Sequence, residues 1–335
     1  MDGIWGSAGK GGVSGWLAKR HIYDTAICAY GTQAGHSYND AERGIQMMTQ
    51  QLPIAVASPF VKNVLLGPGS LIHAETLRNE IGKYLQEGQR LLIHENAAVV
   101  TDEHAEREKA IGMTKMGSTA KGVGQAMIDR LLRNPDTKPI ARLGFAGTDL
   151  EKYVVDRFEY DRVLNQSRRL IVEGAQGFGL SIYHGDWPYC TSRDVTPWQI
   201  AADCGLPFTW APLICTWVVM RTYPIRVNNR DGTSGPAYEG QKELSWEQLG
   251  KHPELTTVTK LPRRVFEFSL QQYQHAMLHC AGMENKVVLT FADYCEEDEL
   301  RDILHRTLTT GARVDYLCFG PDDADIREVE VSDYS

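Results

Sequence analysis

The chain alternates short apolar runs with longer segments in which apolar residues recur every three or four positions. The short runs are rich in Val, Ile and Leu and end in Gly or polar residues, a pattern typical of buried strands. Strands are predicted at 25–30, 90–95, 169–174, 223–227, 286–291 and 314–320.

Two segments between these runs have the spacing of amphipathic helices. In 73–88, Leu77, Ile81 and Leu85 fall four apart on one helix face, and the same spacing predicts a helix over 263–282. Strands separated by helices pair in parallel, since a parallel connection needs a crossover. The predicted fold class is therefore α/β, with a mainly parallel central sheet and flanking helices.

Composition and length favour one soluble domain over residues 1–335. Hydrophobic residues make up 42% and charged residues 23% of the chain, and no repeat, low-complexity tract or clear linker interrupts it. The formal charge of −8 argues against a nonspecific binder of nucleic acid or of anionic membranes.

Three further features indicate a cytoplasmic protein. The first residues are glycine-rich, unlike a secretory signal, and the longest apolar run, 210–220, is too short to cross a bilayer and contains Pro212. That run is predicted to be a buried element. The seven cysteines are scattered, with no C-x-x-C pair, which favours reduced thiols over disulfides or zinc.

Five glycine-rich or polar clusters lie near the ends of the predicted strands. They are "GSAGKGG" (6–12), "TQAGHS" (32–37), "GSTAKGVGQA" (117–126), "EGAQGFG" (173–179) and "FGPDD" (319–323). Each could simply form a turn. Together they favour a binding site, because ligands of open α/β sheets bind beyond the carboxyl ends of strands and glycine lets backbone N–H groups approach an anion.

The first cluster departs from the phosphate-binding P-loop, G-x-x-x-x-G-K-[ST]. Lys10 follows Gly9 as that motif requires, but Gly11 replaces the hydroxyl residue and Ile4 stands where the opening glycine belongs. We predict an anion-binding loop of another kind, in which the role of Ser7 needs an explanation.

Taken in order, the motifs resemble the adenylosuccinate synthetase family along nearly the whole chain. The family motifs G-D-E-G-K-G-K, N-A-G-H-T, E-G-A-Q-G and D-H-G-T-Y-P-Y-V-T-S correspond to "GSAGKGG", "QAGHS", "EGAQG" and "YHGDWPYCTS". The departures resemble the bacteriophage branch, which makes the succinylated precursor of diaminopurine deoxynucleotides. The resemblance implies a P-loop-like adenylosuccinate synthetase fold and a homodimer.

The reaction that the resemblance implies has two steps and needs Mg²⁺. A purine nucleoside triphosphate phosphorylates O6 of dGMP, and the amino group of L-aspartate then attacks C6 and expels phosphate. The product is 2-amino-2′-deoxy-N6-succinoadenylate. Such chemistry needs a phosphate cradle, an electrophile near the transferred group and cationic clamps for carboxylates.

By resemblance, Ser7, Lys10 and His36 are the catalytic candidates. The phosphate-binding set is Gly6, Ser7, Ala8, Gly9, Lys10, Gly11 and Gly35, and the Mg²⁺ ligands are Ser7 and Gly35. The dGMP-binding set is Ser7, Gln33, Ser118, Thr119, Arg142, Gln176 and Thr191, with Arg133 as the alternative arginine reaching the 5′-phosphate from the partner subunit. The aspartate-binding set is Thr257, Val258, Thr259 and Arg263, and the donor base is expected against Phe291, Asp293, Gly320 and Pro321.

Two departures bear on the acceptor nucleotide. Ser7 replaces an aspartate that, in the family, takes the N1 proton of IMP, and serine is smaller and uncharged; Leu261 replaces an arginine near the ribose. We expect dGMP as acceptor, since serine leaves room for a 2-amino group. The alternatives are an adenylosuccinate synthetase acting on IMP and an inactive nucleotide-binding homologue.

A third departure bears on the phosphoryl donor. Phe291, in "TFAD", replaces the lysine that flanks guanine in the family, and the basic residue of a second base-binding segment becomes Asp323. An aromatic ring stacks on any purine, so ATP or dATP is the predicted donor. The alternative is that Phe291 is the buried end of a strand and Asp293 still reads guanine.

Overall fold

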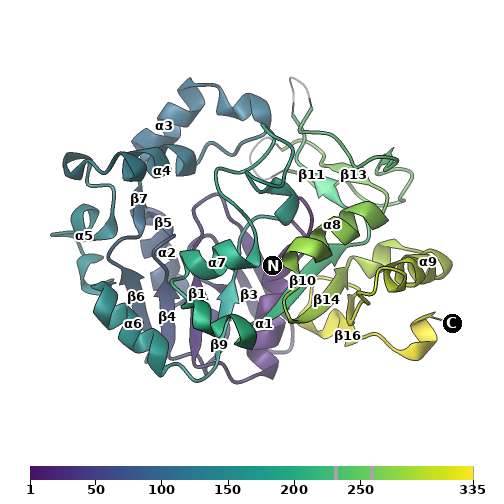
Figure 1. The fold of residues 1–335 in the computed structure, drawn as a ribbon, viewed down its shortest axis with the longest axis horizontal. Helices are drawn as coiled ribbons and strands as arrows, with labels where there is room; N and C mark the ends of the chain where they lie inside the picture. The colour runs from purple at the N-terminus through teal and green to yellow at the C-terminus, as the bar shows by residue number, and fades with distance from the viewer. Residues whose placement is uncertain (230–232, 257–259, 335) are drawn as a thin grey trace.

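A computed structural model describes the chain except residues 230–232, 257–259 and 335, and its centre is a five-stranded parallel sheet (Figure 1). In spatial order its strands are β8 (Val154–Val155), β6 (Arg90–His94), β4 (Asn63–Leu66), β1 (Thr25–Cys28) and β9 (Leu170–Glu173). A four-stranded sheet follows, with β10 (Cys215–Arg221), β14 (Glu284–Thr290), β15 (Tyr316–Cys318) and the antiparallel β16 (Ile326–Glu328).

Smaller sheets and nine α-helices complete the part of the chain that the structure describes. The small sheets pair β2 (His36–Asp40) with β3 (Ile45–Thr49), β5 (Leu71–His73) with β7 (Ala98–Val100), and β13 (Arg264–Phe266) with β11 (Ile225–Arg226) and β12 (Glu243–Leu244). The helices are α1 (Lys10–Arg20), α2 (Ala74–Tyr84), α3 (Asp102–Ala110), α4 (Val123–Leu132), α5 (Ala141–Gly144), α6 (Arg157–Gln166), α7 (Pro197–Asp203), α8 (Leu270–Cys280) and α9 (Glu297–Leu308).

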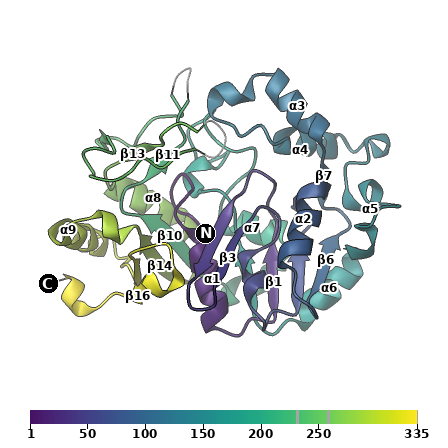
Figure 2. The ribbon, with the colours of Figure 1, turned by 180° about the vertical axis from the view of Figure 1, so that it is seen from behind.

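Both faces of the parallel sheet are buried, which explains the continuous apolar runs of its strands. Ile27, Leu65 and Leu92 pack in one cluster with residues of α6, whereas their strand neighbours such as Cys28 and Leu66 pack in the cluster that includes α1 and α2. Figure 1 shows α6 and α7 in front of the sheet, and Figure 2, seen from behind, shows α1 and α2.

The first residues of the chain join β10 of the four-stranded sheet to the segment that follows β9 of the five-stranded sheet. Asp2 forms parallel bridges to both Val219 and Gly177. The Gly3 amide donates to the Val219 carbonyl at 3.0 Å, and the Phe178 amide donates to the Asp2 carbonyl at 2.9 Å. The loop that follows therefore starts at the junction of the sheets, where strand ends from both converge.

The predicted α/β fold is confirmed, with strands at all six predicted places and helix α2 inside 73–88. The helix predicted over 263–282 is wrong in its first part, because Arg264–Phe266 is strand β13, paired with β11 and β12, and α8 begins at Leu270. The run 210–220 is only partly buried: Leu213 is 80% exposed, and the buried part is in β10.

Two negative predictions concern cysteines and membranes. All seven cysteines are free. In the described part of the chain, no helix has the length and apolar character needed to cross a bilayer.

The structure explains why Gly11 replaces the hydroxyl residue of a P-loop. A Cβ at this position would lie 2.4 Å from the carbonyl oxygen of Ser37 and 2.8 Å from its nitrogen. Strand β2 therefore passes against α1 at Gly11, and the backbone there has little room to move. The close approach brings His36 beside the start of α1.

We predict that Gly11→Ser, which restores the P-loop residue, lowers the free energy of unfolding by about 1–3 kcal/mol because it overpacks this contact. Gly12→Ser is the matched control, since a Cβ at Gly12 meets no atom within 4 Å. Urea unfolding measures both. Equal stabilities of the two variants would show that the contact with Ser37 imposes no constraint.

Candidate active site

The predicted phosphate loop, residues 6–12, is folded around the carboxylate of Asp2. This fully buried side chain accepts hydrogen bonds from the amides of Ile4 (2.9 Å), Gly6 (3.2 Å) and Ala8 (3.1 Å). The backbone turns through left-handed conformations at Gly6, Ser7 and Gly9, with φ of 91°, 58° and 84°. Helix α1 begins directly after this turn. The loop therefore has the position expected of an anion site at a helix N-terminus.

Lys10 and Ser7 occupy different places in the loop. The Lys10 ammonium lies 3.2 Å from a carboxylate oxygen of Asp2, with its side chain 8% exposed. Ser7 is exposed at the turn, and its carbonyl accepts a hydrogen bond from Arg221 at 3.2 Å. The serine side chain is thus free to meet a ligand, while its backbone is held in place.

His36 is the first residue of β2 and is held by Glu173, at the end of β9. Its Nδ1 lies 2.5 Å from Oε1 of Glu173, and both residues are 4% exposed. Glu173 also accepts from Ser14 Oγ (2.5 Å) and from the Ile54 amide (3.0 Å). A carboxylate on Nδ1 fixes the ring orientation and leaves Nε2 as the nitrogen available to a ligand.

Glu173 was missed as a site residue by sequence reasoning. The available signal was a carboxylate ending an apolar strand, inside the "EGAQG" motif. The Tyr30 hydroxyl completes its surroundings by donating to Glu173 at 3.3 Å. Burial, followed by the Glu173 charge, raises the pKa of Tyr30 well above its usual value, so the phenol stays a neutral donor.

Two of the residues predicted to bind dGMP lie close to Glu173, the partner of His36. Gln33 and Gln176 line one small cavity together with Glu173, and Gln176 adopts a left-handed φ of 64°. A non-glycine residue held in that conformation is typical of functional sites. Gln33 Oε1 is buried and has no hydrogen-bond partner within the described chain. A polar ligand or water is the natural partner for this oxygen.

The hydroxyl candidates lie on adjoining segments. The segment containing Ser118 and Thr119 leads into α4, and the next residues contact the histidine loop, since Thr32 Oγ1 donates to the Lys121 carbonyl at 3.3 Å. Ser118 Oγ accepts from the Ala120 amide at 3.2 Å. Thr191 is fixed by its amide, which donates to the Leu180 carbonyl at 2.7 Å.

Arg142 and Arg133 are not brought to this site within the chain. Arg142 lies on α5, at the edge of the molecule in both Figure 1 and Figure 2, and its guanidinium is 3.4 Å from Glu95 and 56% exposed. Arg133 is an exposed residue that caps α4. A role of either arginine toward a second subunit stays a prediction.

The donor-base candidates meet at the ends of two neighbouring strands. Because β14 and β15 are parallel, Phe291 and Asp293 lie at the same edge of the sheet as Gly320 and Pro321. Phe291 has a left-handed φ of 58°, and burial raises the pKa of Asp293. This convergence is as expected for a pocket beyond the carboxyl ends of the strands.

Asp323, which replaces a basic residue of the family, faces the protein interior. It is 4% exposed, and its carboxylate lies 3.1 Å from the Lys19 ammonium and 3.2 Å from the Tyr38 hydroxyl. Its charge is therefore used to join α1 and β2 to the segment after β15.

The aspartate-binding candidates are partly outside the described residues, since Thr257, Val258 and Thr259 lie there. Arg263 is described: its amide donates to the Glu254 carbonyl at 2.7 Å. Burial lowers the pKa of Arg263, while the charge of Glu254 acts in the opposite direction. Arg264, by contrast, is committed to Glu243, 2.6 Å away.

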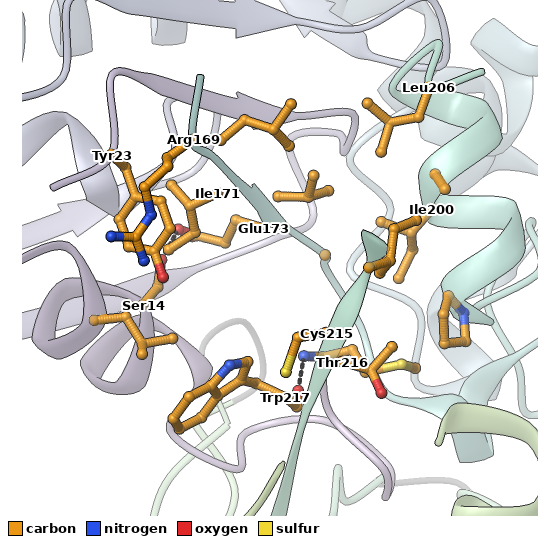
Figure 3. Close-up of a pocket in the computed structure, with 18 of the residues that line it drawn as sticks. Ser14, Tyr23, Arg169, Ile171, Glu173, Ile200, Leu206, Cys215, Thr216 and Trp217 are labelled. Atoms are coloured by element: carbon orange, nitrogen blue, oxygen red, sulfur yellow. Dashed lines mark hydrogen bonds between the residues drawn. The ribbon is translucent and has the colours of Figure 1, made fainter. Parts of the chain in front are cut away.

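A cavity of about 490 Å³ lies between β9 and β10 and is lined in part by Glu173 (Figure 3). Its lining includes Ile171, Ile200, Leu206 and Trp217, and of the predicted site residues Lys10 alone contributes. It runs along β9 to the carboxyl end of that strand at Glu173 and along residues 215–217 of β10. The Met1 ammonium donates to the Trp217 carbonyl there at 2.5 Å.

The adenylosuccinate synthetase family model matches residues 3–137 and 136–304. The N6-succino-2-amino-2′-deoxyadenylate synthase of Acinetobacter phage SH-Ab 15497 is 40% identical over 100% of this chain and 94% of the relative. That of cyanophage S-2L is 39% identical over 97% and 90%. The adenylosuccinate synthetase of Thermococcus onnurineus is 32% identical over 84% and 80%.

Solved structures agree with these matches. The succinoaminodeoxyadenylate synthetase of cyanophage S-2L, bound to dGMP and to dATP as an energy donor, superposes with a TM-score of 0.92 at 37% identity, over 100% of this chain and 97% of that one. The fully ligated adenylosuccinate synthetase of Plasmodium falciparum, at 18% identity, shares the fold with a TM-score of 0.80 over 98% and 99%. The chain belongs to the adenylosuccinate synthetase family.

Proposed function

We propose that the chain is a ligase that condenses dGMP with L-aspartate. It uses ATP or dATP and forms 2-amino-2′-deoxy-N6-succinoadenylate, the nucleoside diphosphate and phosphate. Phage relatives that are 39% to 41% identical to the chain have the name of this activity. The observation that carries the proposal is Ser7, an uncharged, exposed side chain at the turn of an otherwise ordered phosphate loop.

In the first step the loop would hold the phosphoryl group during transfer to O6 of dGMP. The amides at the start of α1 and the Lys10 ammonium supply positive charge at one place. Because Asp2 already fixes Lys10, little reorganisation is needed when charge develops on the phosphoryl oxygens. Preorganised groups of this kind give most of the electrostatic stabilisation in phosphoryl transfer.

His36 would stabilise the same charge from the other side. The Gly11 contact brings its Cβ close to α1, and Glu173 orients the ring. With Nδ1 bound to Glu173, Nε2 is the ring nitrogen that can meet the transferred group or O6. In the second step the amino group of L-aspartate attacks C6, and the C6–O6 bond breaks to release phosphate.

The Mg²⁺ that the family generally uses would be held largely by the nucleotide phosphates and water, with the Ser7 hydroxyl and the Gly35 carbonyl as protein oxygens. The fit is reasonable, because Ser7 is exposed and no atom lies within 4 Å of a Cβ built on Gly35, which leaves the space open. Within the described residues no cluster of three His, Cys, Asp or Glu side chains competes as a metal site. When bound, the ion neutralises phosphate charge.

Serine at position 7 favours guanine over hypoxanthine by size and charge. An aspartate at this turn would place a negative carboxylate and extra volume beside the purine ring. A hydroxyl instead leaves space for the 2-amino group and accepts a hydrogen bond from it.

The proposal also includes a cytoplasmic homodimer, in which Arg142 or Arg133 reaches the partner's nucleotide. Arg263 would bind the carboxylates of L-aspartate.

We predict that wild-type enzyme uses dGMP far better than IMP, and that Ser7→Asp impairs dGMP turnover by crowding and charge. Phosphate release in the presence of L-aspartate and Mg²⁺, with IMP, GMP and dGMP as acceptors, measures both. Comparable kcat/KM for IMP and dGMP would favour an ordinary adenylosuccinate synthetase. No phosphate release with any acceptor would favour an inactive homologue.

His36→Ala should lower kcat by about 10²–10³-fold, the usual effect of losing a preorganised electrostatic group, with a smaller change in acceptor KM. Glu173→Gln should lower kcat by about 10–100-fold, by analogy with carboxylates that orient metal-bound histidines. Glu80→Gln is the matched control, since Glu80 is also a buried carboxylate that accepts backbone amides, those of residues 50–52. A loss confined to KM would make His36 a binding residue.

For the donor, we predict that ATP or dATP serves at least as well as GTP, because Phe291 stacks on any purine and Asp323 is turned inward. Steady-state kinetics with the three triphosphates at saturating dGMP and L-aspartate test this. A strong preference for GTP would mean that Asp293 still reads guanine and that Phe291 is merely the end of a strand.

A further inference from the structure

Arg221, the last residue of β10, is a fully buried arginine to which none of the steps above assigns a role. Its side chain joins three segments that are far apart in the sequence. One guanidinium nitrogen donates to the Ser7 carbonyl at 3.2 Å. The same nitrogen donates to Glu254 at 3.2 Å, and the second terminal nitrogen pairs with the other oxygen of that carboxylate.

The flat face of the guanidinium is also occupied. Its central carbon lies 3.4 Å from the ring centroid of Phe291 and 5.6 Å from that of Tyr294. Tyr294 in turn donates to Glu254 at 3.3 Å. Only a planar fork makes two in-plane hydrogen bonds and a stacking contact at once, so lysine would not satisfy the same partners.

The three segments that Arg221 contacts are assigned to different substrates. Ser7 is at the turn of the phosphate loop, beside the acceptor. Phe291 is the residue predicted to meet the donor base. Glu254 lies directly before the aspartate loop, and its carbonyl receives the amide of Arg263.

We propose that Arg221 is a positioning residue that couples donor binding to L-aspartate binding. The inference rests on the proposed function, because that assignment connects Phe291 and Arg263 with substrates. Being fully buried, Arg221 acts through its neighbours and not by touching a substrate. A base stacked on Phe291 fixes the ring against the guanidinium, which holds Glu254 and therefore the backbone of Arg263.

The Phe291 backbone makes such a link sensitive to the donor. Phe291 adopts a left-handed φ of 58°, which is unfavourable for a bulky residue, and its carbonyl accepts from Thr222 Oγ1 at 2.7 Å. Thr222 follows Arg221 directly in the chain. The side chains of Arg221 and Thr222 therefore both hold Phe291. A movement of the Phe291 ring would displace the Arg221 guanidinium directly.

The test is a matrix of initial rates in which ATP and L-aspartate are both varied at saturating dGMP. In wild-type enzyme, saturating ATP should lower the KM for L-aspartate about 5-fold or more, and saturating L-aspartate should lower the KM for ATP by a similar factor. In Arg221→Lys, each substrate should lower the KM of the other by less than about 2-fold. The KM values for ATP and L-aspartate should rise by a larger factor than kcat falls. Glu254→Gln should have the same effect.

Tyr273→Phe is the control for a general loss of buried hydrogen bonding, since Tyr273 is buried on α8 and donates to the Ala312 carbonyl at 2.7 Å. In this variant, ATP should still lower the KM for L-aspartate, and L-aspartate the KM for ATP, by the wild-type factors. If Arg221→Lys does not fold, Glu254→Gln decides, because that side chain is 27% exposed. Unchanged interdependence in a folded Arg221→Lys or Glu254→Gln enzyme overturns the inference, as does independent binding of the two substrates in wild type.

Failure of this inference is distinguishable from failure of the proposed function. Turnover of dGMP with independent ATP and L-aspartate leaves the function intact and removes the coupling. Absence of dGMP turnover removes the function itself. In that case the same matrix measured with IMP tests Arg221, and interdependence that survives in Arg221→Lys counts against the inference.

Discussion

The active site depends on one buried charge, the carboxylate of Asp2. It receives three backbone amides and the Lys10 ammonium, and the Asp2 side chain itself has no exposure to solvent. A buried carboxylate is costly unless its oxygens are fully paired, so this side chain strongly favours the one loop conformation that supplies those partners. Through its backbone the same residue pairs with Val219 of β10 and with Gly177, which follows β9. The shape of the phosphate loop and the junction of the two sheets are thereby fixed together.

This arrangement explains how the loop accepts serine at position 7. Asp2 binds amides of the loop, and Arg221 binds the carbonyl of Ser7. Neither contact uses the Ser7 side chain. The residue at the turn is therefore free to change with the substrate while the cradle keeps its form. Glu173 plays a comparable part for His36, since a buried acid with several donors determines where the imidazole lies. In each case a buried carboxylate positions a functional group of the candidate site.

Much of the fold was predictable because the spacing of hydrophobic residues and the strand propensity of each segment are local properties of the sequence. The six strands, helix α2 and the convergence of Phe291 with Gly320 all follow from such patterns. The first part of the helix predicted over 263–282 was wrong, because pairing of β13 with two distant strands overrides local periodicity. Glu173 and Arg221 were missed for a related reason, since their partners lie far away in the sequence. The constraint on Gly11 likewise depends on Ser37, which only the folded structure brings near.

The central claim is that O6 of dGMP leaves as phosphate after its phosphorylation, while L-aspartate supplies the new nitrogen. The most direct measurement uses dGMP labelled with ¹⁸O at O6, together with ATP, Mg²⁺ and ¹⁵N-L-aspartate, followed by mass spectrometry of the products. The account predicts one ¹⁸O atom in the released phosphate and one ¹⁵N atom in a succinylated 2-amino-deoxyadenylate. Unlabelled phosphate, or a succinylated nucleotide that retains ¹⁸O, would contradict it.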